Sequence, residues 1–353
     1  MINESVIVGM SGGLDSTIAA YRLLKDGYHV TGVYFRSWKW NNSYQDFQNN
    51  ESWLKTISST LGIKILTVDR RDFFQKFVVH KYIQLIEDGF TPNPCVICNP
   101  HFKFTSLIQL ADELQIEDVA TGHYAIIKKQ NDEWKLYIGK DRLKDQSYML
   151  CLMNQRLLER TKLPLGPTTK KENRMLSEEI GLDFSSIPES QDLCFANHFS
   201  HNLFVKQIIK KGLIPGVILD VKGNQLGKHE GLALYTIGQR KGIKISSEKP
   251  YYVVEKDLEN NILIVGHKDD LGFSRMVLDS INWISRKNKY SLICEVKIRY
   301  HSKSHFANIE KIENNNYLVT FNNKIPDLTP GQYAVLYDHD EMLGGGMILK
   351  VLE

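Results

Sequence analysis

The sequence predicts an α/β fold: an N-terminal, doubly wound parallel sheet with helices on both faces, followed by β-rich modules. The chain opens with a strand, a Ser/Gly loop, a helix and a second strand, and apolar strand-like segments alternate with helical ones up to about residue 200. From there, short β-rich segments are separated by Gly, Asn and Asp. A length of 353 residues exceeds one ordinary domain, so we expect two or three.

The opening unit can be read residue by residue. Residues 6–8 and 30–35 are apolar and rich in β-branched side chains, and Ile18, Leu23 and Leu24 recur between them at a helical period. The strand-like segments IKILTVD and DVATGHYAII, separated by the helical stretches ESWLKTISSTLG and HFKFTSLIQLADELQ, extend this unit into a parallel sheet. The polar, aromatic-studded stretch WKWNNSYQDFQNNESW predicts a mobile loop near the site.

The second half of the chain predicts all-β modules. Its strand-like segments are GVILDVKGNQLG, YYVVEKDLENNILIVG, SLICEVKIRY and NNNYLVTFNNKIPDLTPGQYAVLYD. The triplets KGN and ENN lie between apolar runs and predict hairpin turns.

Composition excludes several classes of protein. Hydrophobic residues make up 42% and charged residues 24%, and no stretch approaches the roughly 18 apolar residues of a membrane span, so we expect no membrane partner. The start MINESVIVGM lacks the features of an export signal, which predicts a cytoplasmic location. Five cysteines do not make a disulfide framework, and a net charge of +3 means that a polyanion must be met by local basic patches.

A glycine loop follows the first strand and opens the first helix. It comprises Gly9, Met10, Ser11, Gly12, Gly13, Leu14, Asp15 and Ser16. Glycines let backbone N–H groups approach a ligand, and a helix N-terminus favours an anion, so the loop predicts a phosphate site. The lysine of a P-loop is missing, and Asp15 is suited instead to holding Mg²⁺ on a leaving pyrophosphate. A tight strand-to-helix turn without a ligand is the alternative.

The segment SGGLDS after VIVGM resembles the SGGxDS signature of the ATP pyrophosphatase (PP-loop) superfamily. That resemblance implies a domain of the adenine nucleotide alpha hydrolase type, which adenylates a carbonyl oxygen and releases pyrophosphate. Amidotransferase synthetases, sulfur transferases and tRNA-lysidine synthetases share the signature. It therefore indicates the activation step and leaves the substrate open.

Further motifs narrow the resemblance. TPNPCVICN…KF, TGHYA, KDQSYML, SQDLCFA, YTIGQRKG, IRY, PGQYAVLY and GGG occur in the order and spacing of the tRNA-specific 2-thiouridylases, the MnmA/TrmU family. The resemblance implies an ATP-binding catalytic domain over residues 1–198, a small central β-rich domain over 199–273, and a tRNA-contacting β-barrel over 274–353. It implies ATP and Mg²⁺ as cofactors. Its implied partners are the wobble-uridine tRNAs for Lys, Glu and Gln and a sulfur-donor protein, either a cysteine desulfurase or a relay protein.

The chemistry needs two cysteines. Uracil C2 is a poor electrophile, so its oxygen must become a leaving group, which transfer of AMP to O2 achieves. Sulfur then arrives from a cysteine persulfide, which a second cysteine resolves into a disulfide or attacks to free sulfide. The resemblance places the nucleophile at Cys98 and the persulfide carrier at Cys194. Cys151 and Cys294 stand in apolar runs and are expected in the core.

Cys95 departs from the family pattern, because many relatives carry Asp at this position. An acid there could handle protons, which a thiol does less readily at neutral pH. Together with Cys98 and Cys194, Cys95 could also hold a [4Fe–4S] cluster with an open site, so that sulfide would be delivered on iron. The disulfide route and the cluster route both stay open.

The resemblance also assigns ligand contacts outside the glycine loop. Phe35 and Gly122, at the ends of two strands, are expected to contact ATP. The expected contacts with tRNA or its target base are Asn93, Pro94, Cys95, His123, Lys144, Asp145, Gln146, Arg299, Tyr300 and Gln332.

Besides Cys95, the chain departs from the family at Phe90, where Arg commonly precedes TPNP, and in a shortened polar stretch after Trp38. These departures fall at positions that the resemblance links to tRNA choice and proton transfer. Two other functions remain: a PP-loop ligase or amidotransferase acting on a small molecule, which would need neither Cys98 nor Cys194, and a non-catalytic tRNA-binding relative. The leading hypothesis requires that folding bring Cys98 and Cys194 together, facing the glycine loop.

Overall fold

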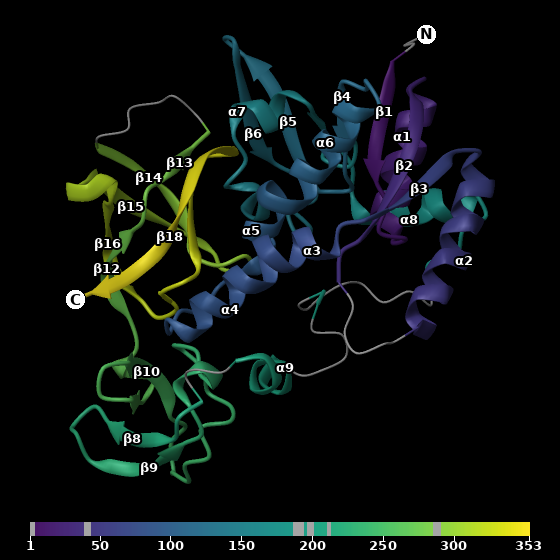
Figure 1. Cartoon of the computed structure of the whole chain (residues 1–353). Coiled ribbons are helices and arrows are strands. Elements are labelled where there is room, and N and C mark those ends of the chain that lie inside the picture. The colour runs from purple at the N-terminus through teal and green to yellow at the C-terminus, as the bar shows by residue number, and fades with distance from the viewer. Residues whose placement is uncertain (1–3, 39–43, 186–193, 196–200, 210–212, 285–290) are drawn as a thin grey trace.

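A computed structural model describes residues 4–38, 44–185, 194–195, 201–209, 213–284 and 291–353. In Figure 1 the N-terminal α/β part occupies the upper right, a β-barrel lies beside it on the left, and a small β sheet lies below the barrel. No helix in the described ranges combines the length and the apolar character needed to span a bilayer.

The N-terminal sheet is parallel, and its strand order reverses at β1. Its order is β3 (Lys64–Asp69), β2 (His29–Arg36), β1 (Ser5–Gly9), β4 (Asp118–Ala120) and β7 (Thr161–Lys162). The chain winds outward from β1 through β2 to β3, then returns to add β4 on the other side. Such a switch point opens a crevice at the carboxyl ends of the strands, where ligands of open α/β sheets bind. The predicted doubly wound α/β fold is confirmed.

Both faces of this sheet are buried. Along β1, Val6 and Val8 pack in one core cluster with Ile18 of α1 (Leu14–Lys25), whereas Ile7 points to the other face and packs with Leu107 of α6 (Thr105–Glu113). The remaining helical segments of this part are α2 (Tyr44–Leu61), α3 (Arg71–Phe74), η1 (Gln75–Val79), α4 (His80–Glu87), α5 (Pro94–Cys98), η2 (Asn99–Phe104), η3 (Ser147–Leu150), α7 (Gln155–Glu159) and α8 (Lys170–Glu179).

The loop predicted over residues 38–53 is wrong from Tyr44 onward, where α2 begins; residues 39–43 lie outside the described ranges. Leu54 and Ile57 of α2 are buried in the core of the sheet, and packing of such a face overrides the weak helix propensity of the Asn-rich residues before it. The segment does reach the glycine loop, because Trp53 Nε1 donates a hydrogen bond to Gly12 O over 2.8 Å.

The strand predicted over DVATGHYAII is divided in two. Only β4 joins the parallel sheet; β5 (Ala125–Gln130) turns away and forms a hairpin with β6 (Glu133–Ile138). β6 in turn pairs with β18 (Glu341–Leu352) of the barrel. The hairpin therefore ties the α/β part to the barrel, a long-range pairing that local sequence cannot specify.

Both predicted hairpins are confirmed, and both lie in the central sheet. In the central sheet the order is β10 (Tyr252–Asp257), β11 (Ile262–Gly266), β8 (Gly216–Asp220) and β9 (Gln225–His229), with KGN joining β8 to β9 and ENN joining β10 to β11. Asn261 in the second turn has a φ of 55°. The short segments η4 (Leu232–Leu234) and η5 (Lys268–Asp270) complete this part, with α9 (His201–Ile208) before it.

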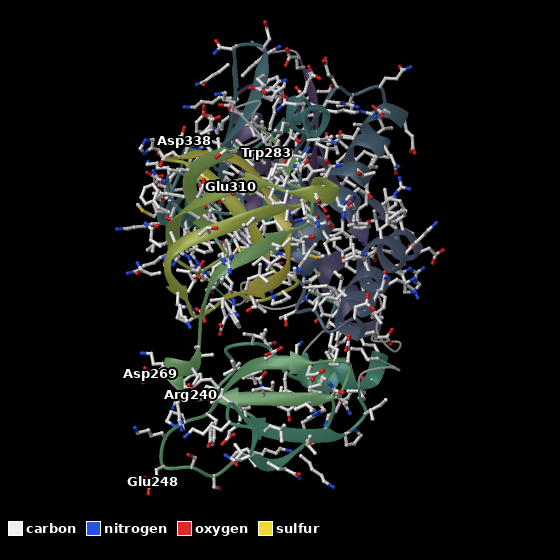
Figure 2. All side chains as sticks on the ribbon, turned by 90° about the vertical axis from the view of Figure 1, so that its left-hand side faces the viewer. Arg240, Glu248, Asp269, Trp283, Glu310 and Asp338 are labelled. Atoms are coloured by element: carbon white, nitrogen blue, oxygen red, sulfur yellow. The ribbon has the colours of Figure 1, made fainter. Side chains whose placement is uncertain are left out.

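The barrel closes because β12 pairs at both ends of the strand series. It contains β12 (Phe273–Leu278), β16 (Tyr317–Ile325), β15 (Ser304–Lys311), β14 (Ser291–Lys297), β17 (Tyr333–Asp338) and β18, with β13 (Asn282–Trp283) paired to β18 and η6 (Glu313–Asn315) before β16. Figure 2 shows Arg240, Glu248 and Asp269 on the central part, below Trp283, Glu310 and Asp338 of the barrel. The predicted C-terminal β-barrel is confirmed.

One core cluster joins the α/β part to the central part. Phe74 and Tyr82, from the helices between Arg71 and Glu87, pack with Phe195, Phe204 and the central strand residue Ile218. The domain limits at residues 198 and 273 stay predictions.

Candidate active site

The glycine loop curls over the start of α1 at the switch point of the sheet. Gly12 has a φ of +83°, which glycine adopts without strain. Ser16 Oγ accepts a hydrogen bond from Ser11 N–H (3.1 Å) and donates one to Gly13 O (3.0 Å). Gly13 is the N-cap and carries no side chain that could cap the helix. The first N–H groups of α1 have no intrahelical acceptor, so the loop offers donors to an anion.

Three other residues of the loop face the protein core. Met10 and Leu14 are buried in the core beside α1, so only their backbone can face a ligand. Gly9 ends β1, and a Cβ there would lie 3.3 Å from Leu107 Cδ1.

Gly122 packs directly on this loop. A Cβ at Gly122 would lie 2.6 Å from the backbone carbon of Asp15, 2.7 Å from its oxygen and 2.8 Å from Ser16 N. Only glycine fits at this approach. The structure thus brings the loop and Gly122 together at the carboxyl edge, although their contact with ATP stays a prediction.

Asp15 has partners that sequence reasoning missed. Its carboxylate accepts hydrogen bonds from the Tyr124 hydroxyl (2.9 Å) and forms an ion pair with Lys170 Nζ, at 2.7 Å and 2.9 Å from its two oxygens. Asn173 Nδ2 donates to the Tyr124 oxygen over 3.0 Å, and Arg22 donates to Asn173 Oδ1. No local spacing points to Lys170, because it lies far along the chain.

Phe35 lies half-buried near the end of β2. Its ring packs edge-on against Phe102, with centroids 6.0 Å apart. Its predicted contact with adenine stays a prediction.

The first two site cysteines lie on α5. Asn93 caps this helix by accepting a hydrogen bond from Cys95 N–H (3.1 Å), and Pro94 occupies the first turn, where its missing N–H costs nothing. A spacing of three residues puts Cys95 and Cys98 on one face of the helix. The π-helical η2 follows and carries Lys103.

Cys194 is exposed, whereas the next residue, Phe195, is only 1% exposed. The Phe195 ring contacts the rings of Trp38, Phe74, Tyr82 and Phe204. Cys194 lies close enough to Cys98 for its thiolate to raise the pKa of Cys98, and Cys95 raises the pKa of Cys194 in the same way. Folding therefore brings the Cys98 and Cys194 thiols to one region, as the leading hypothesis requires; their catalytic roles stay predictions.

The protein surroundings favour the neutral thiols. Desolvation raises the pKa of Cys98 to about 12 and that of Cys194 to about 11, and it also raises the pKa of Cys95. The ammonium group of Lys103 opposes this shift at all three thiols. Lys103 belongs to the motif TPNPCVICN…KF, but sequence reasoning gave it no role.

Two further cysteines lie apart from this region. Cys151 and Cys294 are buried, 0% and 4% exposed, which confirms their predicted place in the core.

His123 lies beside Lys103, with 3.4 Å between His123 Nε2 and Lys103 Nζ. Its Nδ1 is 2.7 Å from Thr121 Oγ1. Burial and the Lys103 charge hold the pKa of His123 well below its usual value, so the ring is neutral near pH 7. Its predicted contact with tRNA stays a prediction.

The KDQ triplet organises its own loop. Asp145 is buried and accepts hydrogen bonds from Gly139 N–H (2.9 Å), Ser147 N–H (3.1 Å) and Ser147 Oγ (2.8 Å). Gln146 Oε1 accepts from Tyr124 N–H over 3.1 Å, while Lys144 is half-buried. These contacts make Asp145 and Gln146 supports of the loop, and the contact of the triplet with tRNA stays a prediction.

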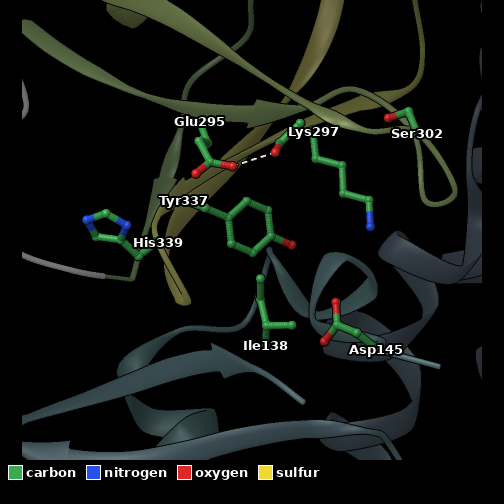
Figure 3. A pocket seen from close by; sticks show the side chains of 8 residues that line it. Ile138, Asp145, Glu295, Lys297, Ser302, Tyr337 and His339 are labelled. Carbon is green, nitrogen blue, oxygen red and sulfur yellow. Dashed lines mark hydrogen bonds between the residues drawn. The ribbon is translucent and has the colours of Figure 1, made fainter. Parts of the chain in front are cut away.

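Asp145 also lines a small cavity between this loop and the barrel. The cavity measures about 120 Å³ and is lined by Ile138, Asp145, Glu295, Lys297, Ser302, Ser304, Tyr337 and His339. In Figure 3 the Lys297 side chain extends from the barrel toward Asp145, and the Tyr337 ring lies beside them. Burial raises the pKa of Asp145, against the opposing charge of Lys297.

Three barrel residues connect the parts of the molecule. Arg299 donates to Ile237 O (3.1 Å) in the central part and to Thr329 Oγ1, while Gln332 Nε2 donates to Thr91 O (2.7 Å) just before α5. Burial, with the charges of Asp145, Cys95 and Asp15, raises the pKa of Tyr300 to about 12. Tyr300 thus lies within electrostatic reach of both the thiol region and the glycine loop. The tRNA roles of Arg299, Tyr300 and Gln332 stay predictions.

The fit of a metal differs between the two predicted sites. Among the described residues, no three Cys, His, Asp or Glu side chains are grouped as ligands of one metal ion. That finding concerns the ligands of a single ion; an iron–sulfur cluster held by Cys95, Cys98 and Cys194 stays a prediction, and we derive no step through one. Asp15 is a carboxylate at an anion-binding loop, which is suited to a Mg²⁺ ion shared with phosphate oxygens.

This architecture, a parallel sheet with a glycine loop at its switch point followed by two β modules, matches models of a class of tRNA-modifying proteins. Residues 4–198 match the tRNA methyl transferase HUP domain, residues 202–267 the tRNA methyl transferase PRC-barrel domain, and residues 273–348 the aminomethyltransferase beta-barrel domain. The chain belongs to the MnmA family of tRNA-specific 2-thiouridylases, which confirms the resemblance seen in its motifs.

Two relatives illustrate how far the similarity extends. The tRNA-specific 2-thiouridylase MnmA 1 of Caldanaerobacter subterraneus is 40% identical over 360 residues, covering 99% of this chain and 99% of the relative. The tRNA-specific 2-thiouridylase MnmA of Natranaerobius thermophilus is 37% identical over 362 residues, covering 99% of this chain and 98% of the relative.

Proposed function

We propose that this protein is a tRNA-uridine 2-sulfurtransferase, which uses ATP to replace O2 of the wobble uridine with sulfur and yields 2-thiouridine, AMP and pyrophosphate. The observation that carries the proposal is the convergence of Cys98 and Cys194, far apart in sequence, within reach of each other's charge. Similarity to 2-thiouridylases over the whole chain supports it.

Activation belongs to the glycine loop. The uridine O2 attacks the α-phosphorus of ATP, so that a P–O bond forms to O2 and the bond to pyrophosphate breaks. The open N–H groups and the positive end of α1 stabilise the phosphates, and Asp15 would hold Mg²⁺, which neutralises charge on the leaving pyrophosphate. The backbone of Gly122 packs against the loop so closely that no larger side chain fits there.

Sulfur transfer belongs to the thiols. The terminal sulfur of a Cys194 persulfide attacks C2, and AMP leaves with the former O2. The Cys98 thiolate then attacks the Cys194 sulfur, breaking the S–S bond; the transferred sulfur stays on C2 and a Cys98–Cys194 disulfide forms. A thiol reductant restores the two thiols. Lys103 stabilises the thiolates that this sequence needs.

The exposure of the thiols supports an order of events. Cys194 is exposed and can meet a sulfur-donor protein, whereas Cys98 is only half accessible. We therefore propose that sulfur enters at Cys194, from a cysteine desulfurase or relay protein. We further propose that the tRNAs for Lys, Glu and Gln are the substrates, in the cytoplasm where they act.

Single replacement of the two cysteines tests the proposal. Unmodified tRNA, ATP and a persulfide donor are incubated anaerobically with wild type, Cys98→Ser, Cys194→Ser and, as a control, the core variant Cys294→Ala. We expect 2-thiouridine to form with wild type and Cys294→Ala and to be lost with both serine variants, while ATP binding persists.

Other outcomes would replace the proposal. Unchanged turnover in both serine variants would indicate a ligase or amidotransferase. Binding of tRNA without ATP-dependent release of pyrophosphate would indicate a non-catalytic relative. Iron and sulfide are measured on the same anaerobic preparation, and thiolation that depends on iron would favour the [4Fe–4S] route through Cys95, Cys98 and Cys194.

A further inference from the structure

The glycine loop lacks the cation that phosphate-binding loops commonly contain. SGGLDS has Asp15 where a P-loop would place Lys before its Ser or Thr. The structure supplies a lysine from elsewhere: Lys170, 155 residues further along the chain, points its ammonium group at the Asp15 carboxylate.

The backbone around Lys170 is held by several hydrogen bonds. It is the first residue of α8, whose N-cap Thr169 forms a capping box with Glu172. The Lys170 N–H donates to Asp141 Oδ2 over 2.9 Å. Three residues on, Asn173 is fully buried and bonded to both Arg22 of α1 and Tyr124. The helix start is therefore docked against the loop, and the Lys170 side chain is only 14% exposed.

We propose that Lys170 is the phosphate-binding cation of the loop and contacts the pyrophosphate part of ATP, with Asp15 as its counterion when no nucleotide is bound. The inference rests on the proposed function, in which pyrophosphate is the leaving group. A triphosphate brings several negative charges to the same place, so it competes with one carboxylate for the ammonium group. The flexible lysine stem lets Nζ change partner while α8 stays docked.

The alternative is a purely structural ion pair. A partly buried pair contributes little net stability, but removing one partner leaves the other charge unpaired. A structural pair would thus affect stability and all nucleotides alike. A phosphate-binding lysine distinguishes ATP from AMP, because AMP has no β- and γ-phosphates.

Equilibrium binding of Mg·ATP and of AMP to the full-length protein tests the proposal. The variants are Lys170→Met, Lys170→Arg and the matched control Lys171→Met, whose side chain is exposed on the same helix. We expect Lys170→Met to weaken ATP binding about ten- to a hundredfold, the loss of one charge-assisted hydrogen bond, and to leave AMP binding nearly unchanged. Lys170→Arg retains part of the ATP affinity, and Lys171→Met binds both nucleotides like wild type.

Unchanged ATP binding in Lys170→Met, or an equal loss for ATP and AMP, would overturn the proposal. If that variant fails to fold, Asp15→Asn decides. Without Mg²⁺, removing the competing carboxylate should make Asp15→Asn bind inorganic pyrophosphate more tightly than wild type, and no gain would refute the counterion role. Neither measurement involves tRNA or sulfur, so failure of the thiolation proposal and failure of this inference are separate results.

Discussion

The two ends of the candidate site are built in opposite ways. At the glycine loop, the Asp15 carboxylate is paired with Lys170, and the N-terminus of α1 offers donors to an anion. At the thiol end, desolvation keeps Cys98 and Cys194 protonated, and the Lys103 charge opposes it only in part. The loop is organised for its ligand before the ligand arrives. The raised pKa values favour the neutral thiols, so the thiolates that sulfur transfer would use require a change in their surroundings.

The anchoring of the thiol end can be broken at Phe195. Phe195→Ala removes a ring buried among four others, which should lower the free energy of unfolding by about 3–5 kcal/mol and release Cys194 from its place near Cys98. Denaturant unfolding measures the first effect. The rate of Cys98–Cys194 disulfide formation under a mild oxidant, in a Cys95→Ser background, measures the second.

The matched control is Phe204→Ala, in the same core cluster but outside the Cys194 turn. It should lose similar stability but form the Cys98–Cys194 disulfide at the wild-type rate, whereas Phe195→Ala should form it more slowly. If Phe195→Ala forms the disulfide as fast as Phe204→Ala, Phe195 does not position Cys194.

The loop end can be broken at Gly122. Gly122→Ala places a methyl group 2.6–2.8 Å from the backbone of Asp15 and Ser16, so the loop must shift. We expect ATP binding to fall by at least about tenfold, at a cost of about 1–3 kcal/mol in stability, while alkylation of Cys194 is unaffected.

Gly223→Ala is the control for the cost of replacing a glycine. Gly223 has a φ of +87° in a hairpin turn, and its added Cβ meets no atom within 4 Å. It should lose stability through backbone strain alone and bind ATP normally. An ATP affinity of Gly122→Ala equal to that of Gly223→Ala would show that the loop tolerates the displacement.

The loop end was predictable from sequence, because its residues are contiguous. The run from Gly9 to Ser16 follows a strand and opens a helix, and each of these features depends on local residue types. The parallel sheet and the central hairpins were predictable because their strand and turn signals are also local. The helix start at Tyr44 was missed because burial of Leu54 and Ile57, which lie later in the helix, outweighs the local composition.

The contacts across the chain were not predictable. Lys170 reaches Asp15, and Gln332 reaches Thr91, through packing of segments that are distant in sequence. The β5–β6 hairpin joins the barrel by a pairing between residues more than two hundred positions apart, such as Tyr137 with Glu341. The family resemblance assigns Cys98 and Cys194 to one reaction, but only the fold shows that Cys194 lies close enough to affect the pKa of Cys98.

The effect of Lys103 on the protonation of the thiols can be tested by replacing it. Because its ammonium group stabilises the thiolates, Lys103→Met should raise the pKa of Cys194 further, and the thiolate fraction at a given pH should fall. The pH profile of iodoacetamide alkylation at Cys194, followed by mass spectrometry, should move to higher pH with a severalfold slower rate at pH 8. Lys103→Arg keeps the charge and the wild-type profile.

Lys81→Met, which removes an exposed lysine on α4, controls for loss of any positive charge. The same spectra compare the two thiols in wild type, where burial raises the pKa of Cys98 more than that of Cys194, so we expect Cys194 to be alkylated faster. If the pH profile of Lys103→Met coincides with that of wild type, Lys103 does not stabilise the thiolates.

The smallest expected effect concerns the link between α2 and the glycine loop. Trp53→Phe keeps an aromatic ring against Phe184 but removes the hydrogen bond from Trp53 Nε1 to Gly12 O. Gly12 O then bonds to water or stays unpaired. Loss of this hydrogen bond should cost about 0.5–1.5 kcal/mol in the free energy of the ATP-binding conformation, so ATP affinity should weaken by roughly two- to tenfold. Thermal unfolding should change little, and the alkylation rate at Cys194 should not change, because the thiols make no use of this bond. A loss of thiol reactivity in Trp53→Phe would mean that the two ends of the site are coupled through α2, and that their opposite construction does not make them independent.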